Sequence, residues 1–257
     1  MRIAALQMRA VAGDPAANLA RIERAAGEAA ARGAALLITP ELAVTGYGAG
    51  EAIPALAENV EGPVVDRLAA IARDAGIAIV CGIAERDGDD VYNSTALVDG
   101  TGRRLVYRKS HLYGPYERGL FRPGLPAAVT ADLGGLQTGL LICYDVEFPE
   151  NVRRLARAGV ELVIVPTALP ASGHAAFIAE KMVPVRAFEN QIFVAYVNHC
   201  GGDGRFAYAG LSVIAAPDGT MLAQAGADDE ALLVADIDPA AYADSRSANT
   251  YLEDLRT

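Results

Sequence analysis

The chain has 257 residues, of which 52% are hydrophobic, and its formal net charge is −10. This length allows one large domain or two small ones, and the hydrophobic content allows a sizeable buried core. The acidic excess argues against nucleic acid as a partner, because phosphate binding requires a basic surface, and it also disfavours binding to an anionic membrane surface. No apolar run is long enough for a transmembrane helix, so we expect no membrane association.

The cysteines and the N-terminus bear on the compartment of the protein. Three cysteines, far apart in the sequence, do not form a disulfide framework. The chain begins with a strand-like segment and lacks the apolar run and cleavage site of a signal peptide. We therefore expect a cytoplasmic protein. His and Cys residues do not cluster with the spacing of metal ligands, so we expect neither a metal ion nor an organic cofactor.

The first half of the chain alternates between strand-like and helix-like segments. A helix is expected from Pro15 to residue 32, because Asp14 is a good N-cap and proline suits the first helical position. A second helix is expected to begin at Pro63 and to end at Gly76. Strands are expected over residues 3–7, 35–39, 77–83, 91–98 and 105–108, with hairpin turns at 87–90 and 99–102.

The second half begins with a segment of a different kind. Residues 109–126 contain Gly, Pro, Tyr and charged residues without periodicity, which predicts a long functional loop. Helices are expected over 149–158 and about 175–190, the latter kinked or broken at Pro184, which lacks a backbone N–H. Strands are expected over residues 137–143, 162–165, 192–198, 211–215 and 231–237, with a hairpin turn at 217–219. The alternation predicts a layered α/β domain, but it does not distinguish one sheet from two.

Two charged side chains follow predicted strands, where α/β folds place their chemistry. Glu41 comes directly after a buried strand and a proline, and it is a candidate general base. Lys109 also follows a strand and precedes the long loop, so its ammonium group is a candidate for stabilising an oxyanion. Taken singly, each residue is better explained as an ordinary solvated side chain on a loop.

Cys143 lies between a predicted strand and a helix that begins at Pro149. A thiol on such a tight turn has backbone N–H groups nearby that favour a nucleophilic role, although a buried structural cysteine is the alternative. Cys81, inside an apolar strand, and Cys200, before two glycines, favour the structural alternative. A nucleophilic thiol needs a base. A Cys–His pair remains open, but none of the three histidines has an evident orienting motif: His111, His174 and His199.

Three short motifs occur in a fixed order around these candidates: residues 40–47 (PELAVTGY), 107–112 (YRKSHL) and 141–150 (LICYDVEFPE), with further similarity at 121–124 and 189–191. In these motifs the chain resembles the nitrilase superfamily of carbon–nitrogen hydrolases along nearly its whole length. The resemblance implies a four-layer α-β-β-α sandwich, with one domain over residues 1–257. It also implies a triad of Glu41, Lys109 and Cys143, and Glu117 matches a second glutamate of the family.

Within the superfamily the sequence is similar to 5-aminopentanamidase and related small-amide amidases, in residues 141–156, 164–168 and 251–256. This similarity implies hydrolysis of a small aliphatic primary amide, such as the ω-amino amide 5-aminopentanamide, to a carboxylate and ammonia. The alternatives share the triad: an N-carbamoyl hydrolase, an ω-amidase, a stereoselective amidase or a nitrilase. A binding or glutamine-channelling module is an alternative of another class. Residues 171–181 show no shared pattern, which leaves the substrate open.

The resemblance implies a thioester on Cys143, with Glu41 as the base and with Lys109 and the Tyr144 N–H stabilising the oxyanion. Glu117 is expected to position the substrate and Lys109. Glu147 is expected either to pair with a cationic group of the substrate or to cap the following helix. The residues expected to contact the substrate are Tyr47, Tyr113, Tyr144, Glu147, Phe148, Thr167 and Ala168.

The resemblance also implies a homodimer or a higher homo-oligomer. Members of the superfamily usually assemble through helices near the active site, often with the C-terminal tail placed on a neighbouring copy. The tail of this chain, from about residue 245, is expected to lie at such an interface. Tyr251 and Leu252 are its apolar candidates for contact with a second copy.

Overall fold

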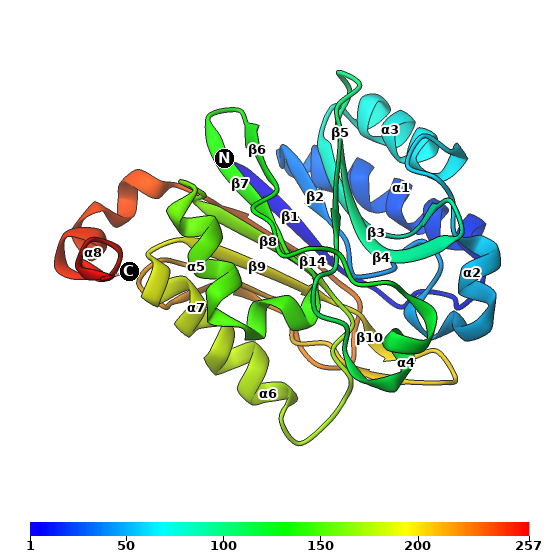
Figure 1. Cartoon of the computed structure of the whole chain (residues 1–257). Helices are drawn as coiled ribbons and strands as arrows, with labels where there is room; N and C mark the ends of the chain where they lie inside the picture. Colours follow the sequence, from blue (N-terminus) through cyan, green and yellow to red (C-terminus); the bar gives the residue numbers. More distant parts are fainter. Residues whose placement is uncertain (257) are drawn as a thin grey trace.

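Two six-stranded sheets lie face to face between outer layers of helices in the computed structural model, which describes residues 1–256 (Figure 1). Residue 257, the end of the tail, lies outside the described residues. The first sheet has parallel pairing at its centre, where β1, β2 and β3 adjoin. In spatial order its strands are β14 (Ala231–Asp236), β1 (Arg2–Gln7), β2 (Leu36–Ile38), β3 (Ala78–Asp87), β4 (Asp90–Val98) and β5 (Arg104–Arg108).

The second sheet also has parallel strands at its centre and antiparallel strands at its edges. In spatial order its strands are β13 (Met221–Gln224), β12 (Val213–Ala215), β9 (Phe193–Asn198), β8 (Leu162–Thr167), β7 (Leu136–Leu140) and β6 (Thr130–Leu133). A separate two-stranded ribbon consists of β10 (Cys200–Gly202) and β11 (Ala207–Ala209). The expected four-layer α-β-β-α architecture is confirmed.

The long helices cover the outer faces of the sheets (Figure 1). Helices α1 (Pro15–Ala31) and α3 (Pro63–Ala75) lie on the first sheet, and α5 (Pro149–Arg157) and α7 (Val183–Asn190) lie on the second. Their ends follow the sequence signals: the Asp14 carboxylate accepts a hydrogen bond from Ala17 N (3.0 Å), and Gly76 ends α3 with φ 68°.

Short helical segments connect these layers. Beyond the long helices, the described chain contains 3-10 helices Tyr47–Ala52, Cys143–Glu147 and Pro239–Tyr242, a π-helix Ile178–Met182, and α2 (Ile53–Leu56), α4 (Gly114–Leu120), α6 (Ala175–Phe177), α8 (Ala243–Ala248) and α9 (Tyr251–Asp254). No helix within residues 1–256 is long and apolar enough to cross a membrane.

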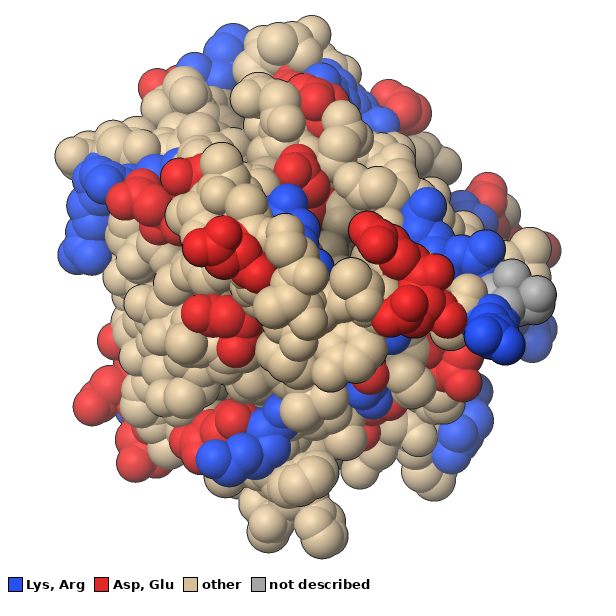
Figure 2. Space-filling model, turned by 90° about the vertical axis from the view of Figure 1, so that its left-hand side faces the viewer, with Lys and Arg blue, Asp and Glu red and all other residues tan. Residues whose placement is uncertain are grey.

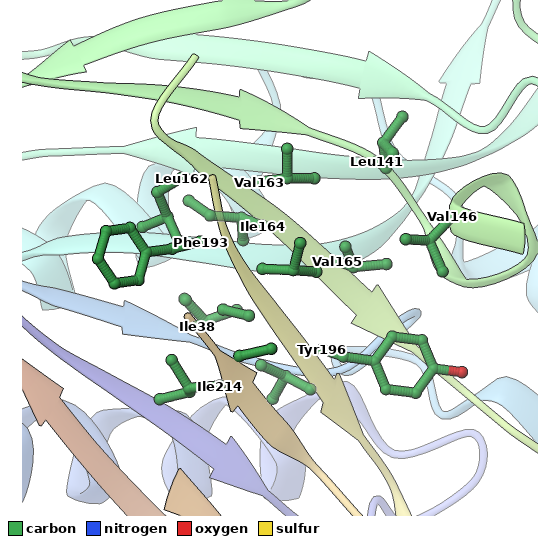
Figure 3. Close-up of a cluster of buried hydrophobic side chains, with 14 of the residues drawn as sticks. Ile38, Leu141, Val146, Leu162, Val163, Ile164, Val165, Phe193, Tyr196 and Ile214 are labelled. Carbon is green, nitrogen blue, oxygen red and sulfur yellow. The ribbon is translucent and has the colours of Figure 1, made fainter. Parts of the chain in front are cut away.

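Side-chain alternation on the first sheet divides the hydrophobic core in two. Ile3 and Ile38 point toward the second sheet, whereas Ala4 and Leu37 pack under α1 and α3. Strand β8 is buried along its whole length because it has the first sheet on one side and helices on the other. Figure 3 shows Ile164, Val165, Phe193 and Ile214 with Ile38 in one cluster of buried hydrophobic side chains around the second sheet.

Three expected elements differ in detail. The segment 109–126 is not one long loop, because α4 forms within it; its sequence GPYERGL has too few apolar residues to show helical periodicity. The expected strand 137–143 ends at Leu140, because the backbone turns before Cys143, whose φ is 45°. The expected helix 175–190 is interrupted by the π-helix immediately before Pro184.

The C-terminal tail packs on its own chain. Helix α9 lies against α7, where the Tyr251 ring meets the Phe188 ring at a centroid distance of 5.8 Å. Leu252 packs against the main core. On the side of the molecule where the tail lies, acidic and basic side chains are interspersed with uncharged surface (Figure 2). The oligomer interface expected here stays a prediction.

Candidate active site

Glu41, Lys109 and Cys143 follow strands β2, β5 and β7, and the fold brings these three strand ends together. The Lys109 Nζ atom lies 2.7 Å from Glu41 Oε1 and 2.6 Å from Glu117 Oε1. Lys109, Glu41 and Glu117 are all fully buried. The three side chains form a charged cluster that water does not reach. None of them is therefore an ordinary solvated side chain on a loop.

The two carboxylate oxygens of Glu41 differ in their surroundings. Oε1 accepts hydrogen bonds from Lys109 Nζ and from Asn93 Nδ2 (2.7 Å each). Oε2 is buried and has no hydrogen-bond partner among residues 1–256. Burial lowers the pKa of His199, whose neutral ring lies with Nε2 2.7 Å from the Glu41 carbonyl oxygen. The loop that carries Glu41 is therefore held through the Oε1 atom and the backbone carbonyl of this residue. The Oε2 atom is available to accept a proton.

The charge on Lys109 depends on its two partners. Burial alone would lower the pKa of Lys109, but the carboxylates of Glu41 and Glu117 more than reverse this effect and raise it well above its usual value. Burial raises the pKa of Glu117, and Lys109 opposes that rise. Glu117 is oriented by the Tyr47 hydroxyl (2.9 Å) and by the backbone N–H of Tyr113 (2.8 Å). The cluster thus holds a permanent cation in a water-excluded position.

Cys143 lies on a strained turn between β7 and the 3-10 helix Cys143–Glu147. Its φ of 45° is uncommon for a residue other than glycine, and such strain is concentrated at functional sites. Burial raises the pKa of the Cys143 thiol well above its usual value, and the negative charge of Glu41 adds to the rise. The thiol is therefore protonated at neutral pH, and a reaction through its sulfur requires a base.

A cavity of about 470 Å³ opens beside Cys143. Five of the seven expected substrate-contact residues line it: Tyr47, Tyr113, Tyr144, Glu147 and Ala168. The structure places the other two outside its lining. The Phe148 ring instead stacks on the His111 ring (centroids 4.0 Å apart), and the Thr167 hydroxyl donates to the Val165 carbonyl (3.0 Å).

The remaining wall of the cavity comes from residues 169–182, which include the segment 171–181 that shows no shared sequence pattern. It is largely apolar and consists of Leu169, Pro170, Ser172, His174, Phe177, Ile178 and Met182. Sequence reasoning also missed Asn93 and His199 as partners of Glu41. A signal for Asn93 exists, since residues 93–95 are three consecutive polar residues in an otherwise apolar strand.

No group of three or more His, Cys, Asp or Glu side chains within residues 1–256 has the arrangement of a metal site. Glu117 and Cys143 line the cavity, whereas Lys109 and Glu41 are buried outside its lining, with Lys109 in contact with Glu117. Carboxylates, an ammonium group and a thiol in this arrangement can perform base-assisted nucleophilic attack with electrostatic stabilisation of an oxyanion.

Comparisons with known proteins agree with this chemistry. The family described as Carbon-nitrogen hydrolase matches residues 2–247. A Pseudomonas protegens protein named "Hydrolase in pqqF 5'region" is 46% identical, with 100% of this chain and 89% of that protein covered. An "(R)-stereoselective amidase" from Pseudomonas sp. is 36% identical, with 100% and 92% covered.

A solved structure of the amidase from Nesterenkonia sp. AN1 is 39% identical, with a TM-score of 0.88 and with 100% of this chain and 96% of that chain covered. In that structure, a variant with glutamine in place of a glutamate, the active-site cysteine carries acrylamide as a Michael adduct. The chain described here belongs to the carbon–nitrogen hydrolase family and is an amidase of the nitrilase superfamily with a cysteine active site.

Proposed function

We propose that this amidase hydrolyses a small aliphatic primary amide to a carboxylate and ammonia, through a thioester on Cys143. The observation that carries the proposal is the composition of the cluster beside the cavity. The cluster combines a thiol whose pKa is raised, a buried ammonium group and a carboxylate oxygen that has no hydrogen-bond partner among residues 1–256. Each of the three has a defined part in acyl transfer.

In the acylation half, Glu41 Oε2 takes the thiol proton as the Cys143 sulfur attacks the amide carbonyl carbon. The resulting oxyanion is stabilised by the Lys109 ammonium group and by the backbone N–H of Tyr144; loss of one such donor typically slows turnover about 100- to 1000-fold. Glu41 then returns the proton to the departing nitrogen. The carbon–nitrogen bond breaks, ammonia leaves, and the acyl group remains on sulfur as a thioester.

In the deacylation half, Glu41 takes a proton from a water molecule that attacks the thioester carbonyl carbon. The second oxyanion uses the same stabilising groups. When it collapses, the carbon–sulfur bond breaks, the sulfur regains a proton from Glu41, and the carboxylic acid leaves and loses its own proton to water as the carboxylate product. Glu117 holds Lys109 in place through the 2.6 Å contact and faces the cavity, where it positions the substrate amide.

The cavity suggests an acyl chain with a cationic end. Glu147 lines it, and burial raises the pKa of this carboxyl group. Arg186 binds the backbone carbonyl of Glu147 (2.9 Å), whereas the Glu147 carboxylate accepts no hydrogen bond from residues 1–256. We therefore propose an ω-amino amide such as 5-aminopentanamide, with its methylenes against the apolar wall. The amidase from Nesterenkonia sp. AN1, solved with butyramide, supports short aliphatic amides more generally.

The proposal is tested by ammonia release from butyramide, 5-aminopentanamide, an ω-carboxy monoamide, a nitrile and an N-carbamoyl amine. We expect 5-aminopentanamide to have the highest kcat/KM. Replacement Glu147→Gln should raise KM for 5-aminopentanamide about tenfold, as expected for a lost charged hydrogen bond, and should leave butyramide nearly unchanged.

The matched control is Glu180→Gln, because the Glu180 carboxylate binds Gln224 (2.9 Å) and does not line the cavity. An unchanged KM for 5-aminopentanamide in Glu147→Gln would contradict the proposed preference for ω-amino amides, but it would leave the proposed reaction unaffected. Absence of ammonia release from every linear amide would contradict the proposed reaction, and turnover of only the carbamoyl compound would replace it with carbamoyl hydrolysis.

A further inference from the structure

Asp145, two residues after Cys143, is fully buried and is the acceptor at the centre of a hydrogen-bond network. Its Oδ1 atom accepts from Ser110 Oγ (2.8 Å) and from His111 N (2.9 Å), and it lies 2.9 Å from His111 Nδ1, which also lies 3.2 Å from Asn151 Nδ2. Its Oδ2 atom accepts from the Tyr107 hydroxyl (2.9 Å). All three donors come from the end of β5 and the segment after it.

The same carboxylate also binds its own turn. Asp145 Oδ2 accepts a hydrogen bond from Ile142 N (3.3 Å), which closes the turn that carries Cys143. A carboxylate that served only to cap this turn would need that contact alone. The three donors from residues 107–111 exceed this need, and they flank Lys109 on both sides in the sequence.

We propose that Asp145 is a positioning residue of this enzyme, which fixes the Lys109 ammonium group relative to the Cys143 sulfur. The inference rests on the proposed roles of these two residues. Lys109 and Cys143 lie on different sheets, so sheet hydrogen bonding does not set their separation. One buried carboxylate bonded to both segments does set it. Small displacements at a reaction centre are costly, since about 1 Å can reduce the rate about 100-fold.

The network extends to the wall of the cavity. The His111 ring stacks on the Phe148 ring, with centroids 4.0 Å apart, and the Phe148 ring meets the edge of the Tyr144 ring at 4.9 Å. Tyr144 lines the cavity and meets the Tyr113 ring at 5.2 Å. Phe148, expected from the sequence to contact substrate, therefore packs against Tyr144, which lines the cavity.

Replacement Asp145→Asn tests the proposal with almost no change in volume. An amide presents N–H groups at one of the two oxygen positions, where backbone donors such as Ile142 N–H cannot turn away. We expect kcat for amide hydrolysis to fall about 100-fold while KM stays within about threefold, because the cavity keeps its substrate contacts. Ser110→Ala, which removes one donor, should lower kcat about threefold to tenfold.

The matched control is Gln191→Glu, another nearly isosteric change in a buried network, at the far end of α7. Gln191 Nε2 donates to the carbonyls of Phe188 (2.7 Å) and Pro217 (3.1 Å), and the carboxylate in its place would repel both. This variant should lose thermal stability and keep wild-type kcat. If Asp145 has only a structural role, Asp145→Asn should likewise lose thermal stability and keep wild-type kcat.

The outcomes distinguish failure of the proposed reaction from failure of the proposed positioning role of Asp145. Wild-type ammonia release tests the reaction itself, whereas kcat of Asp145→Asn relative to Gln191→Glu, at equal folded fraction, tests the positioning role. A kcat of Asp145→Asn within threefold of wild type would overturn that role. If Asp145→Asn does not fold, Ser110→Ala decides, and an unchanged kcat in this milder variant would be the contrary result.

Discussion

At the residue scale, the environment of the Cys143 thiol explains why a carboxylate base is needed. Burial and the charge of Glu41 raise the pKa of this thiol well above its usual value, and Lys109 only partly opposes them. A cysteine paired with a protonated histidine would instead exist as a thiolate before substrate binds. In the proposed mechanism the proton therefore leaves during the attack, and it passes to Glu41 Oε2, a buried carboxylate oxygen with no hydrogen-bond partner among residues 1–256.

Replacement Glu41→Gln should therefore slow the hydrolysis of the amide and at the same time make the Cys143 thiol easier to deprotonate. Ammonia release should fall about 100- to 10,000-fold, because the general base is lost. Alkylation of Cys143 by iodoacetamide should shift its midpoint to lower pH, because removal of a negative charge lowers the pKa of the thiol. Mass spectrometry across a pH series measures this rate, with Cys143→Ala as the blank. A midpoint that moves to higher pH would show that Glu41 does not act on the thiol as described.

At the scale of elements, Gly82 in β3 determines how the Glu41 loop lies on the first sheet. A Cβ atom at this position would lie 2.3 Å from the backbone nitrogen of Leu42 and 2.4 Å from the carbonyl oxygen of Pro40. A glycine in a buried strand commonly marks such a close approach of backbone. The close contact allows the loop to place Glu41 directly over the strand.

Replacement Gly82→Ala should consequently damage activity through an element rather than through a catalytic group. We expect about 1–3 kcal/mol of lost unfolding free energy, from overpacking against backbone, together with a kcat reduced at least tenfold. Gly27→Ala is the control, since Gly27 is an exposed interior residue of α1 with nothing within 4 Å of its Cβ position. The Gly27→Ala change should increase the unfolding free energy by about 0.5–1 kcal/mol. Denaturant unfolding and ammonia release measure both variants, and wild-type kcat in Gly82→Ala would refute the close-packing argument.

Elements with strong local signals were predictable from the sequence, and those set by tertiary contacts were not. The ends of α1 and α3 follow from Asp14 and Gly76, whose capping chemistry is local. Helix α4 has only seven residues, with glycine at its first position, and forms where Glu117 binds Lys109 and Tyr47. The π-helix is likewise invisible to a periodicity of 3.6 residues.

At the scale of the whole molecule, two stacked sheets explain how distant residues form one site. The ends of β2, β5 and β7 carry Glu41, Lys109 and Cys143, so their meeting could be anticipated from strand ends together with the family motifs. The cavity wall could not be anticipated from the sequence, because Phe177 and Met182 lie in a segment whose position depends on the π-helix and on packing of α7. Substrate specificity is therefore the property least accessible from the sequence.

Two of the three buried cysteines, Cys143 and Cys200, provide the most direct test of the proposed nucleophile. Cys200 is buried like Cys143, but it lies in the ribbon formed by β10 and β11 and does not line the cavity. The measurement is ammonia release from butyramide by Cys143→Ala and Cys200→Ala, each confirmed as folded by thermal unfolding. The account predicts at least a 1000-fold loss of kcat in Cys143→Ala and nearly unchanged turnover in Cys200→Ala. Wild-type turnover by Cys143→Ala would contradict it.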